Sequence, residues 1–276
     1  MKKIFLSIVL IISLAVCACA AEKENYVGVL AQLNMTESEY EAFVLDGRRN
    51  VGWNFLSYGS ERFRYYDSLS AMQLALNIGE IAQIQLPEVV AEYFVKSDVN
   101  SYTVSGVSQF KTTYFAMGFL EKKAALRDRF NEALKALKEN GTLEKLVKDY
   151  IDNFKENGEK PIRFTKFDGA ETIKVALTGD MPPIDFVAAN GSPRGFNVAI
   201  LAEIGRQLKI NFEVYNIETV ARAAALASGR VDVVFWYKGT KDSDLQPDIP
   251  KEVILSDSYY EWNKFLLVKM KKRGGK

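Results

Sequence analysis

Apolar residues recur along this chain in two alternating patterns, short continuous runs and amphipathic stretches. Short runs rich in β-branched and aromatic residues predict buried strands. These runs lie at residues 27–33, 62–66, 81–86, 102–107, 114–120, 173–178, 212–215, 231–236 and 265–269. Apolar residues at helical spacing predict helices at about 36–44, 70–77, 87–95, 196–208 and 219–227, with two more between 121 and 154. The alternation of strands and helices favours an α/β fold with largely parallel sheets.

Several helix ends carry local signals. Thr36, followed three residues later by Glu39, is a capping-box pattern that opens a helix. Gly79 ends the helix at 70–77, and Pro87 suits the first turn of the next helix. In the two helices between 121 and 154, apolar stripes predict core-facing surfaces, formed by Leu126, Phe130, Leu134, Leu137, Leu143, Leu146, Val147, Tyr150, Ile151 and Phe154.

The pattern also indicates two units joined by a linker. Residues 155–171 are polar, contain Pro161 and lack periodicity, which is typical of a linker. The segments ALNIGEIAQI (75–84) and ALASGRVDVV (225–234) share the end of a helix, a glycine and a buried strand. We interpret this internal similarity as two lobes of related design, with generic helix–glycine–strand chemistry as the alternative.

The first 20 residues have the features of a secretory signal. Two lysines precede an apolar run at 4–16, and small residues follow it. The run is shorter than the roughly 20 residues of a membrane span. We therefore expect an exported protein, located in the periplasm or at the extracellular face of the cytoplasmic membrane.

The end of this segment allows two cleavage sites. Residues 18–20 fit the rule for ordinary signal peptidase, whereas residues 16–19 resemble a loose lipoprotein box that would leave Cys19 as the lipidated first residue. Cys17 and Cys19 are the two cysteines of the chain, so the exported part is expected to contain no disulfide.

Composition narrows the chemistry further. With 36 Lys and Arg against 35 Asp and Glu, the net charge of +1 gives no long-range field to attract nucleic acid or an anionic membrane. The chain has no histidine, which removes the usual proton shuttle and the commonest zinc ligand. We expect no cofactor, no metal site and no enzyme activity, and a carboxylate enzyme using Glu88 and Asp180 is the weakest of the hypotheses.

Two series of motifs resemble the halves of one family in reversed order. Residues 172–270 contain IKVALTGDMPPIDF, NGSPRGFNVAILAEIGRQL, ALASGRVDVVFW and ILSDSYYEWNKFLLVKM. Residues 26–154 contain VGVLAQLNMTESEY, YYDSLSAMQLALNIGEI, PEVVAEYFV and ALRDRFNEALKALKENGTLEKLVKDYI. They resemble the first and second halves of family 3 extracellular solute-binding proteins of ABC transporters, the polar amino-acid type. The resemblance implies an α/β, two-lobed periplasmic-binding-protein-like fold (type II), here circularly permuted.

The resemblance implies the following organisation. Lobe B is residues 26–114, and lobe A is residues 172–270 together with a hinge strand and helices at 115–154 that pack on it. Residues 155–171 link the usual last helix to the usual first strand. Because one crossover is cut, we expect the lobes to move more freely than usual, unless the cut ends pair as neighbouring strands. A monomer is expected, with a swapped dimer as the alternative.

Ligands in open α/β sheets bind beyond the carboxyl ends of the strands. This rule selects four segments, 34–36, 86–88, 178–186 and 236–240, which are expected to face each other across the cleft between the lobes. The candidate ligand-binding residues are Asn34, Thr36, Glu88, Asp180, Met181, Phe186, Trp236, Tyr237, Lys238 and Thr240.

Several candidates have a structural alternative. Thr36 matches the family's threonine that holds a ligand carboxylate at a helix start, but it also suits a plain N-cap. Asp180 could accept a hydrogen bond from a ligand amine or simply form a turn. Trp236 could stack on a flat ligand or pack within the lobe. Lys238 could supply a positive charge, whereas Phe186 is interpreted mainly as structural.

Other positions depart from the amino-acid-binding pattern. The family's carboxylate-binding arginine would fall near Asp244, where the sequence has no arginine. The acid that pairs with the ligand amine would fall at Pro87, with Glu88 beside it, and Met181 replaces an aromatic. An acid of the family is also missing at Asn197 or Ala199. Loss of the bidentate carboxylate clamp should remove much of the specificity for a zwitterion.

The sequence thus predicts a protein that captures a small polar solute, an amino acid or a derivative, between two lobes and delivers it to an ABC permease. The alternative is a degenerate or ligand-sensing relative without a transport role.

Overall fold

The fold is given by a computed structural model, which describes residues 26–31, 36–39, 41–42, 62–154, 160–241 and 249–271, without the side chains of 62, 108–111, 236–238 and 240. The strands of the main sheet are β1 (Tyr26–Leu30), β2 (Arg62–Tyr66), β3 (Gln83–Pro87), β4 (Tyr102–Leu120), β5 (Thr172–Leu177), β9 (Asn211–Asn216), β10 (Val233–Thr240), β11 (Val253–Leu255) and β12 (Tyr260–Met270).

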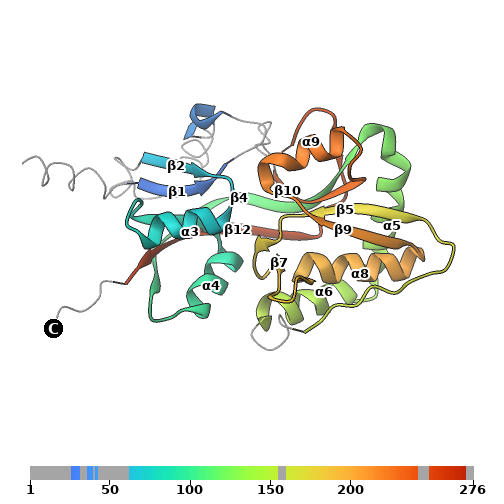
Figure 1. The fold of residues 1–276 in the computed structure, drawn as a ribbon, viewed down its shortest axis with the longest axis horizontal. Helices are drawn as coiled ribbons and strands as arrows, with labels where there is room; N and C mark the ends of the chain where they lie inside the picture. Colours follow the sequence, from blue (N-terminus) through green and yellow to red (C-terminus); the bar gives the residue numbers. More distant parts are fainter. Residues whose placement is uncertain are drawn as a thin grey trace, which may run out of the picture.

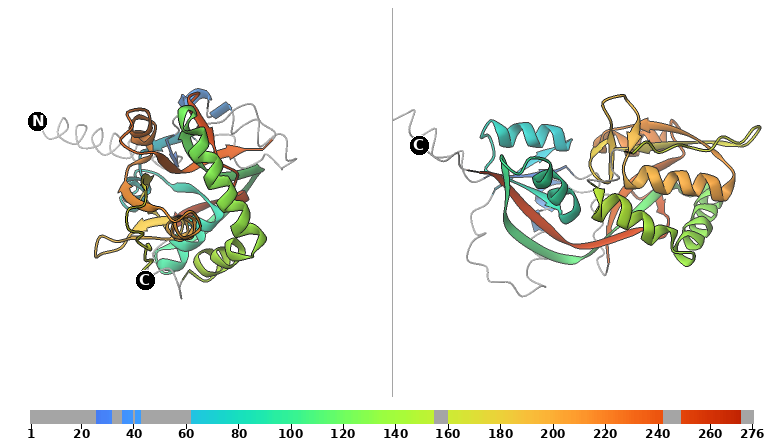
Figure 2. Two further views of the ribbon diagram at one scale, coloured as in Figure 1. Left: turned by 90° about the vertical axis from the view of Figure 1, so that its right-hand side faces the viewer. Right: turned by 90° about the horizontal axis from the view of Figure 1, so that it is seen from below.

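The sheet runs through both lobes in the order β2-β1-β3-β12-β4-β10-β5-β9, with β11 paired to β4. Figure 1 shows β1, β2, α3 and α4 grouped on one side and β5, β9, β10, α5, α6, α8 and α9 on the other. Strands β4 and β12 pass from one group to the other, side by side (Figure 2). Any hinge motion between the two groups must therefore bend these two strands.

Lobe B has two parallel strand pairs, β1 with β2 and β1 with β3. Its helices are α3 (Leu69–Asn77) and α4 (Glu88–Ser97). The helix predicted after Thr36 is present at residues 37–39 and 41–42. The helical faces bury Met72 and Val90, among others, against the sheet, because apolar area removed from water is the main favourable term in folding.

Lobe A is built around parallel strands β10, β5 and β9. Its helices are α5 (Ala124–Glu139), α6 (Thr142–Val147), α8 (Phe196–Leu208) and α9 (Arg222–Ala227), with short turns η1 (Glu121–Lys123), η2 (Lys148–Asp152) and η3 (Thr219–Ala221). A second, small sheet consists of β6 (Asp180–Met181), β7 (Asp185–Val187) and β8 (Pro193–Arg194).

The predicted apolar stripes do face the core. Phe130 and Leu134 on α5 are fully buried, and Leu143 and Leu146 on α6 are nearly so. The rings of Phe130 and Phe119 meet edge to face at 5.3 Å between centroids, a favourable aromatic geometry. Helices α5 and α6 also contact α8.

The structure confirms a two-lobed α/β fold and corrects several predicted elements. The strands predicted at 102–107 and 114–120 are one continuous strand, β4. The last strand starts at Tyr260, five residues before the predicted start at 265, because it pairs with β4 across the lobe boundary. The sheet is mixed, not largely parallel, because β4 and β12 run antiparallel to their neighbours. The sequence pattern also missed the small sheet β6-β7-β8.

The chain ends near the hinge do not pair with each other. The two cut ends are the first strand, β1, and the last strand, β12. In the sheet β3 lies between them, so they do not pair as neighbouring strands that would restrain the lobes. Residues 265–268 of β12 pair with β3 and thus lie beside lobe B. The circular permutation and the freer lobe motion stay predictions.

In the part of the chain that the structure describes, no helix combines the length and apolar character needed to cross a lipid bilayer.

Candidate functional site

The two lobes meet directly at Asp180. This residue lies in β6 of lobe A, and its Oδ2 accepts a hydrogen bond of 2.9 Å from the backbone N–H of Leu69, the first residue of α3 in lobe B. The N–H of Ser70 is a second donor. Burial raises the pKa of the Asp180 carboxyl, and these two N–H groups act in the opposite direction. One predicted ligand-binding residue is therefore engaged by the opposite lobe.

A second contact between the lobes is aromatic. Tyr93 on α4 packs against Phe154 and Phe186 of lobe A, with ring centroids 4.8 Å and 6.4 Å apart. The ammonium of Lys96 lies 5.7 Å from the centre of the Phe154 ring, within the range of a cation–π contact. Phe186, predicted to be mainly structural, thus packs at the lobe interface.

The loop that carries Asp180 is held in place by hydrogen bonds to a buried carboxylate, that of Asp185. Asp185 is fully buried and accepts hydrogen bonds from the hydroxyl of Thr178, the N–H of Gly179 (2.7 Å) and the side-chain amide of Asn197 (2.7 Å). Burial raises the pKa of Asp185, and the three donors and Arg222 counter that effect. Asn197, where the family's acid was expected, thus donates its side-chain amide to the Asp185 carboxylate.

The start of α8 is closed by the same loop. The N–H groups of Phe196 and Asn197 donate to the carbonyls of Pro183 and Ile184 at 3.0 Å and 2.8 Å. Gly195, at φ 102°, permits this approach, because a Cβ there would lie 2.6 Å from the Ile184 carbonyl oxygen. The first turn of α8 is thus satisfied by protein atoms.

Glu88, a predicted ligand-binding residue, forms an ion pair at the hinge. Its carboxylate lies 3.1 Å from the ammonium of Lys264 on β12. Glu92, one turn later on α4, pairs with Lys96 at 2.7 Å. Both pairs are partly exposed, so each contributes at most about 1 kcal/mol to stability.

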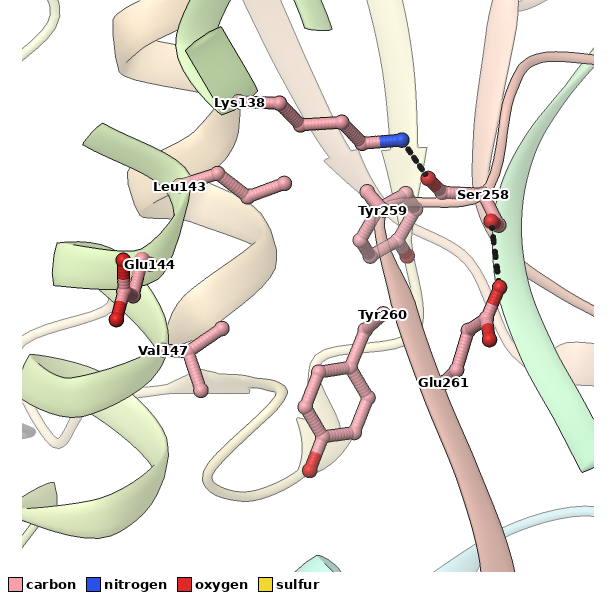
Figure 3. Close-up of a pocket in the computed structure, with 8 residues that line it drawn as sticks. All are labelled: Lys138, Leu143, Glu144, Val147, Ser258, Tyr259, Tyr260 and Glu261. Carbon is pink, nitrogen blue, oxygen red and sulfur yellow. Dashed lines mark hydrogen bonds between the residues drawn. The ribbon is translucent and has the colours of Figure 1, made fainter. Parts of the chain in front are cut away.

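A cavity of about 380 Å³ lies in lobe A between α5, α6 and the start of β12 (Figure 3). Its lining residues are Lys138, Leu143, Glu144, Val147, Ser258, Tyr259, Tyr260 and Glu261. The Lys138 ammonium donates to the Ser258 carbonyl at 2.7 Å, and the Ser258 hydroxyl donates to Glu261 at 3.1 Å. None of the residues predicted as ligand-binding lines this cavity.

Tyr260 connects this cavity with the lobe interface. Burial raises its pKa to about 12, and the carboxylates of Asp152, Glu88 and Glu92 add to the rise. These carboxylates come from η2 of lobe A and α4 of lobe B, so the Tyr260 hydroxyl faces the junction of both lobes.

An aromatic group surrounds the hinge behind Tyr260. Phe115 on β4 lies 4.0 Å from the Trp262 ring and 6.1 Å from the Tyr260 ring, measured between centroids. Phe196 meets Tyr260 at 5.7 Å. The indole N–H of Trp262 is buried with no hydrogen-bond partner in the described part of the chain. These rings form an apolar surface at the lobe junction.

Thr36 forms the predicted capping box. Its N–H and hydroxyl both donate to the Glu39 carboxylate, at 2.8 Å and 2.7 Å, and its hydroxyl oxygen accepts from the Glu39 N–H at 3.3 Å. These contacts lower the pKa of Glu39. The geometry is that of the N-cap interpretation, and the carboxylate-binding role of Thr36 stays a prediction.

The remaining predicted residues divide into two sets. Met181 is buried, in a hydrophobic cluster that also contains Leu69 and Met72 of α3. Asn34 and Cys19 lie outside the described residues, as do the side chains of Trp236, Tyr237, Lys238 and Thr240. Within the described ranges, no cluster of acidic, histidine or cysteine side chains is placed to hold a metal ion.

Sequence reasoning missed several residues at the lobe junction. Tyr93 and Lys264 were not selected, although both follow from position: Tyr93 is on the helix after Pro87, and Lys264 precedes the apolar run of the last strand. Within lobe A, the pattern also missed Arg222, which is fully buried and donates to the Phe235 carbonyl at 2.9 Å. A lone arginine in the alanine-rich segment 221–227 was the available signal.

Comparison with known proteins supports the resemblance for one part of the chain. Residues 173–273 match the model of the family described as bacterial extracellular solute-binding proteins, family 3. This segment is similar to that family. The matched family consists of solute-binding proteins of ABC import systems, not enzymes. No curated protein matches the chain at the sequence level.

Several solved structures align with most of this chain at low sequence identity. A ligand-binding component of an ABC-type import system from Staphylococcus aureus is 11% identical, with 90% of this chain and 66% of that chain covered and a TM-score of 0.43. A putative L-cystine ABC transporter from Listeria monocytogenes is 13% identical, with 91% and 84% covered and a TM-score of 0.41. The BvgS VFT2 domain from Bordetella pertussis is 11% identical, with 91% and 82% covered and a TM-score of 0.43.

Proposed function

We propose that this protein captures a small polar solute, an amino acid or a derivative, between its two lobes and delivers it to an ABC permease. The observation that carries the proposal is the family match over residues 173–273, a segment that includes the loop with Asp180 and most of lobe A. The chemistry is non-covalent, and the protein works outside the cytoplasm. Cleavage at the signal would leave it either free or lipid-anchored through Cys19.

Two features of the junction support binding between the lobes. The lobes are joined by β4 and β12, which lie behind the surfaces that meet, so closure can enclose a solute. Aromatic rings and carboxylates converge there, namely Tyr260 with Glu88 and Glu92. The adjacent cavity of about 380 Å³ falls in the size range of small-molecule pockets. Aromatic rings beside carboxylates favour solutes that carry an amine.

A second function is favoured by the direct contact of the lobes. Asp180 and Tyr93 both reach the opposite lobe through protein groups alone. A relative that senses ligands, or that has lost its ligand, would have this feature, because protein groups then replace the solute. The two hypotheses differ in whether any free solute binds.

Thermal-shift measurements against amino acids, their amine and acid derivatives, and small organic acids separate the hypotheses. A solute at 100 times its dissociation constant should stabilise the fold by about 2.7 kcal/mol. Glu88→Gln should weaken binding of amine solutes, and Lys135→Gln, on the exposed face of α5, is the matched control.

Native mass spectrometry tests directly whether the purified protein carries a bound solute. A bound amine-containing solute, retained by the parent and lost from Glu88→Gln, supports the transport hypothesis. An empty protein that shows no shift with any member of the panel would overturn that hypothesis and support the degenerate one.

A further inference from the structure

The N-terminus of α3 in lobe B is completed by groups from two places in the chain. The Ser68 hydroxyl accepts from the Ala71 N–H at 3.2 Å, and the Ser68 carbonyl accepts from the Met72 N–H at 3.2 Å. The Leu69 N–H donates instead to Asp180, 111 residues away in the sequence, in the opposite lobe. The N–H groups of Leu69 and Ser70 in the first turn of α3 therefore have this acceptor only while the lobes are together.

The charge of this turn also depends on the opposite lobe. The first turn of α3 contains no acidic residue. A carboxylate at a helix N-terminus is stabilised by the aligned peptide dipoles, and Asp180 provides that carboxylate from outside the helix. Without Asp180, α3 would keep the Ser68 cap and lose the anionic one.

Asp180 cannot follow α3 if the lobes separate. It pairs with Phe186 in the small sheet of lobe A, and the neighbouring Gly179 N–H is held by the buried Asp185 carboxylate. The loop is thus fixed to lobe A on both sides of Asp180. Rotation about β4 and β12 must break the hydrogen bond between Asp180 and Leu69.

We propose that Asp180 is an interlobe latch that holds the solute-free protein closed by capping α3 of the opposite lobe. A solute then enters only while the latch is open. This inference goes beyond solute binding, since it concerns the protein with no solute present.

The groups around Asp180 act on its pKa in opposite directions. Burial raises the pKa, and Asp185 of β7 and Glu218, which precedes η3, add to the rise from lobe A. The N–H groups of Ser70 and Leu69 in lobe B lower it, and on that side Asp67 precedes the Ser68 N-cap. The hydrogen bonds that cross between the lobes therefore favour the ionised carboxylate.

The latch is testable by the distance between the lobes in solute-free protein. Spin labels at Leu74→Cys in α3 and Val220→Cys in η3 report it, because both side chains are exposed; Cys17 and Cys19 are replaced by serine. The parent should give one narrow distance distribution. Asp180→Ala should give a longer or broader distribution. Asp180→Asn, which keeps a carbonyl acceptor but removes the charge, should give a distribution between those of the parent and Asp180→Ala.

Ser68→Ala is the matched control, because it removes the cap that α3 makes for itself and leaves Asp180 in place. It should keep the parent distance. A distribution for Asp180→Ala identical to that of the parent would overturn the latch, as would opening of Ser68→Ala to the same extent.

Discussion

Two of the described helix starts in lobe B satisfy the same kind of backbone group in different ways. The helix after Thr36 is capped by its own residues, with Thr36 and Glu39 bonding each other reciprocally. Helix α3 is capped partly by Ser68 and partly by Asp180 of lobe A. Both arrangements pair N–H groups that a helix leaves without internal partners.

The difference separates local stability from coupling between lobes. A cap within four residues forms whenever the helix forms, so it stabilises that helix irrespective of lobe position. A cap supplied across the junction forms only on closure, so its energy belongs to the closed state. The same kind of hydrogen bond stabilises the helix itself after Thr36 and stabilises the closed arrangement of the lobes at α3.

The largest effect is expected when the support of Asp180 is removed. Asp185→Ala deprives Gly179 and Asn197 of their buried acceptor, which should cost about 3 kcal/mol. It should also release the loop and thereby open the lobes. Urea unfolding measures the loss, and Asp128→Ala, at an exposed carboxylate on α5, is the control. A loss below about 1 kcal/mol for Asp185→Ala would contradict this role.

Removal of the aromatic contact should have the next largest effect. Tyr93→Ala removes the ring that packs between Phe154 and Phe186, and we expect a loss of about 1–2 kcal/mol and a wider lobe distance. Thermal unfolding and the spin-label distance measure the two consequences. Tyr93→Phe retains the ring and should behave like the parent; equal effects of both variants would rule out ring packing as the cause.

The Ser68 cap should matter less and only locally. Ser68→Ala should cost about 1 kcal/mol, the usual value for an N-cap, and speed hydrogen exchange in α3. Combined with Asp180→Ala, it should show coupling, because both groups cap one turn. Strict additivity of the two losses would indicate that the caps act on independent structures.

The smallest effect is expected at the local cap. Glu39→Gln retains an acceptor but removes the charge that Thr36 contacts, so it should speed exchange only in the helix after Thr36. The lobe distance should stay that of the parent. An altered lobe distance in Glu39→Gln would abolish the distinction between the local cap and the cap from the opposite lobe.

Much of the fold follows from local sequence pattern, because its causes are local. Apolar spacing located the core of α5, with Phe130 and Leu134, and the four-residue pattern at Thr36 predicted the capping box. The pattern failed along β4, which it divided in two, because a crossing strand changes its environment midway between the lobes. It also missed the small sheet of β6, β7 and β8, whose strands are two or three residues long.

The candidate site was predictable in position more than in contacts. The rule about carboxyl ends of strands selected Asp180, Phe186 and Glu88, and the structure places all three at the lobe junction. Their partners are Leu69, Tyr93 and Lys264, each at least 90 positions away in the chain. No periodicity or short motif relates residues at such separations.

The sequence alone determined the alternation of strands and helices, the apolar faces, the resemblance to solute-binding proteins and the local cap at Thr36. Each depends on residues within a few positions of one another or on a motif read in order. Only the tertiary structure decided that Asp180 caps α3, that the buried Asp185 accepts from Asn197, and that β4 spans both lobes. These outcomes depend on which surfaces meet when the chain folds, because a hydrogen bond forms only where folding brings donor and acceptor within about 3 Å.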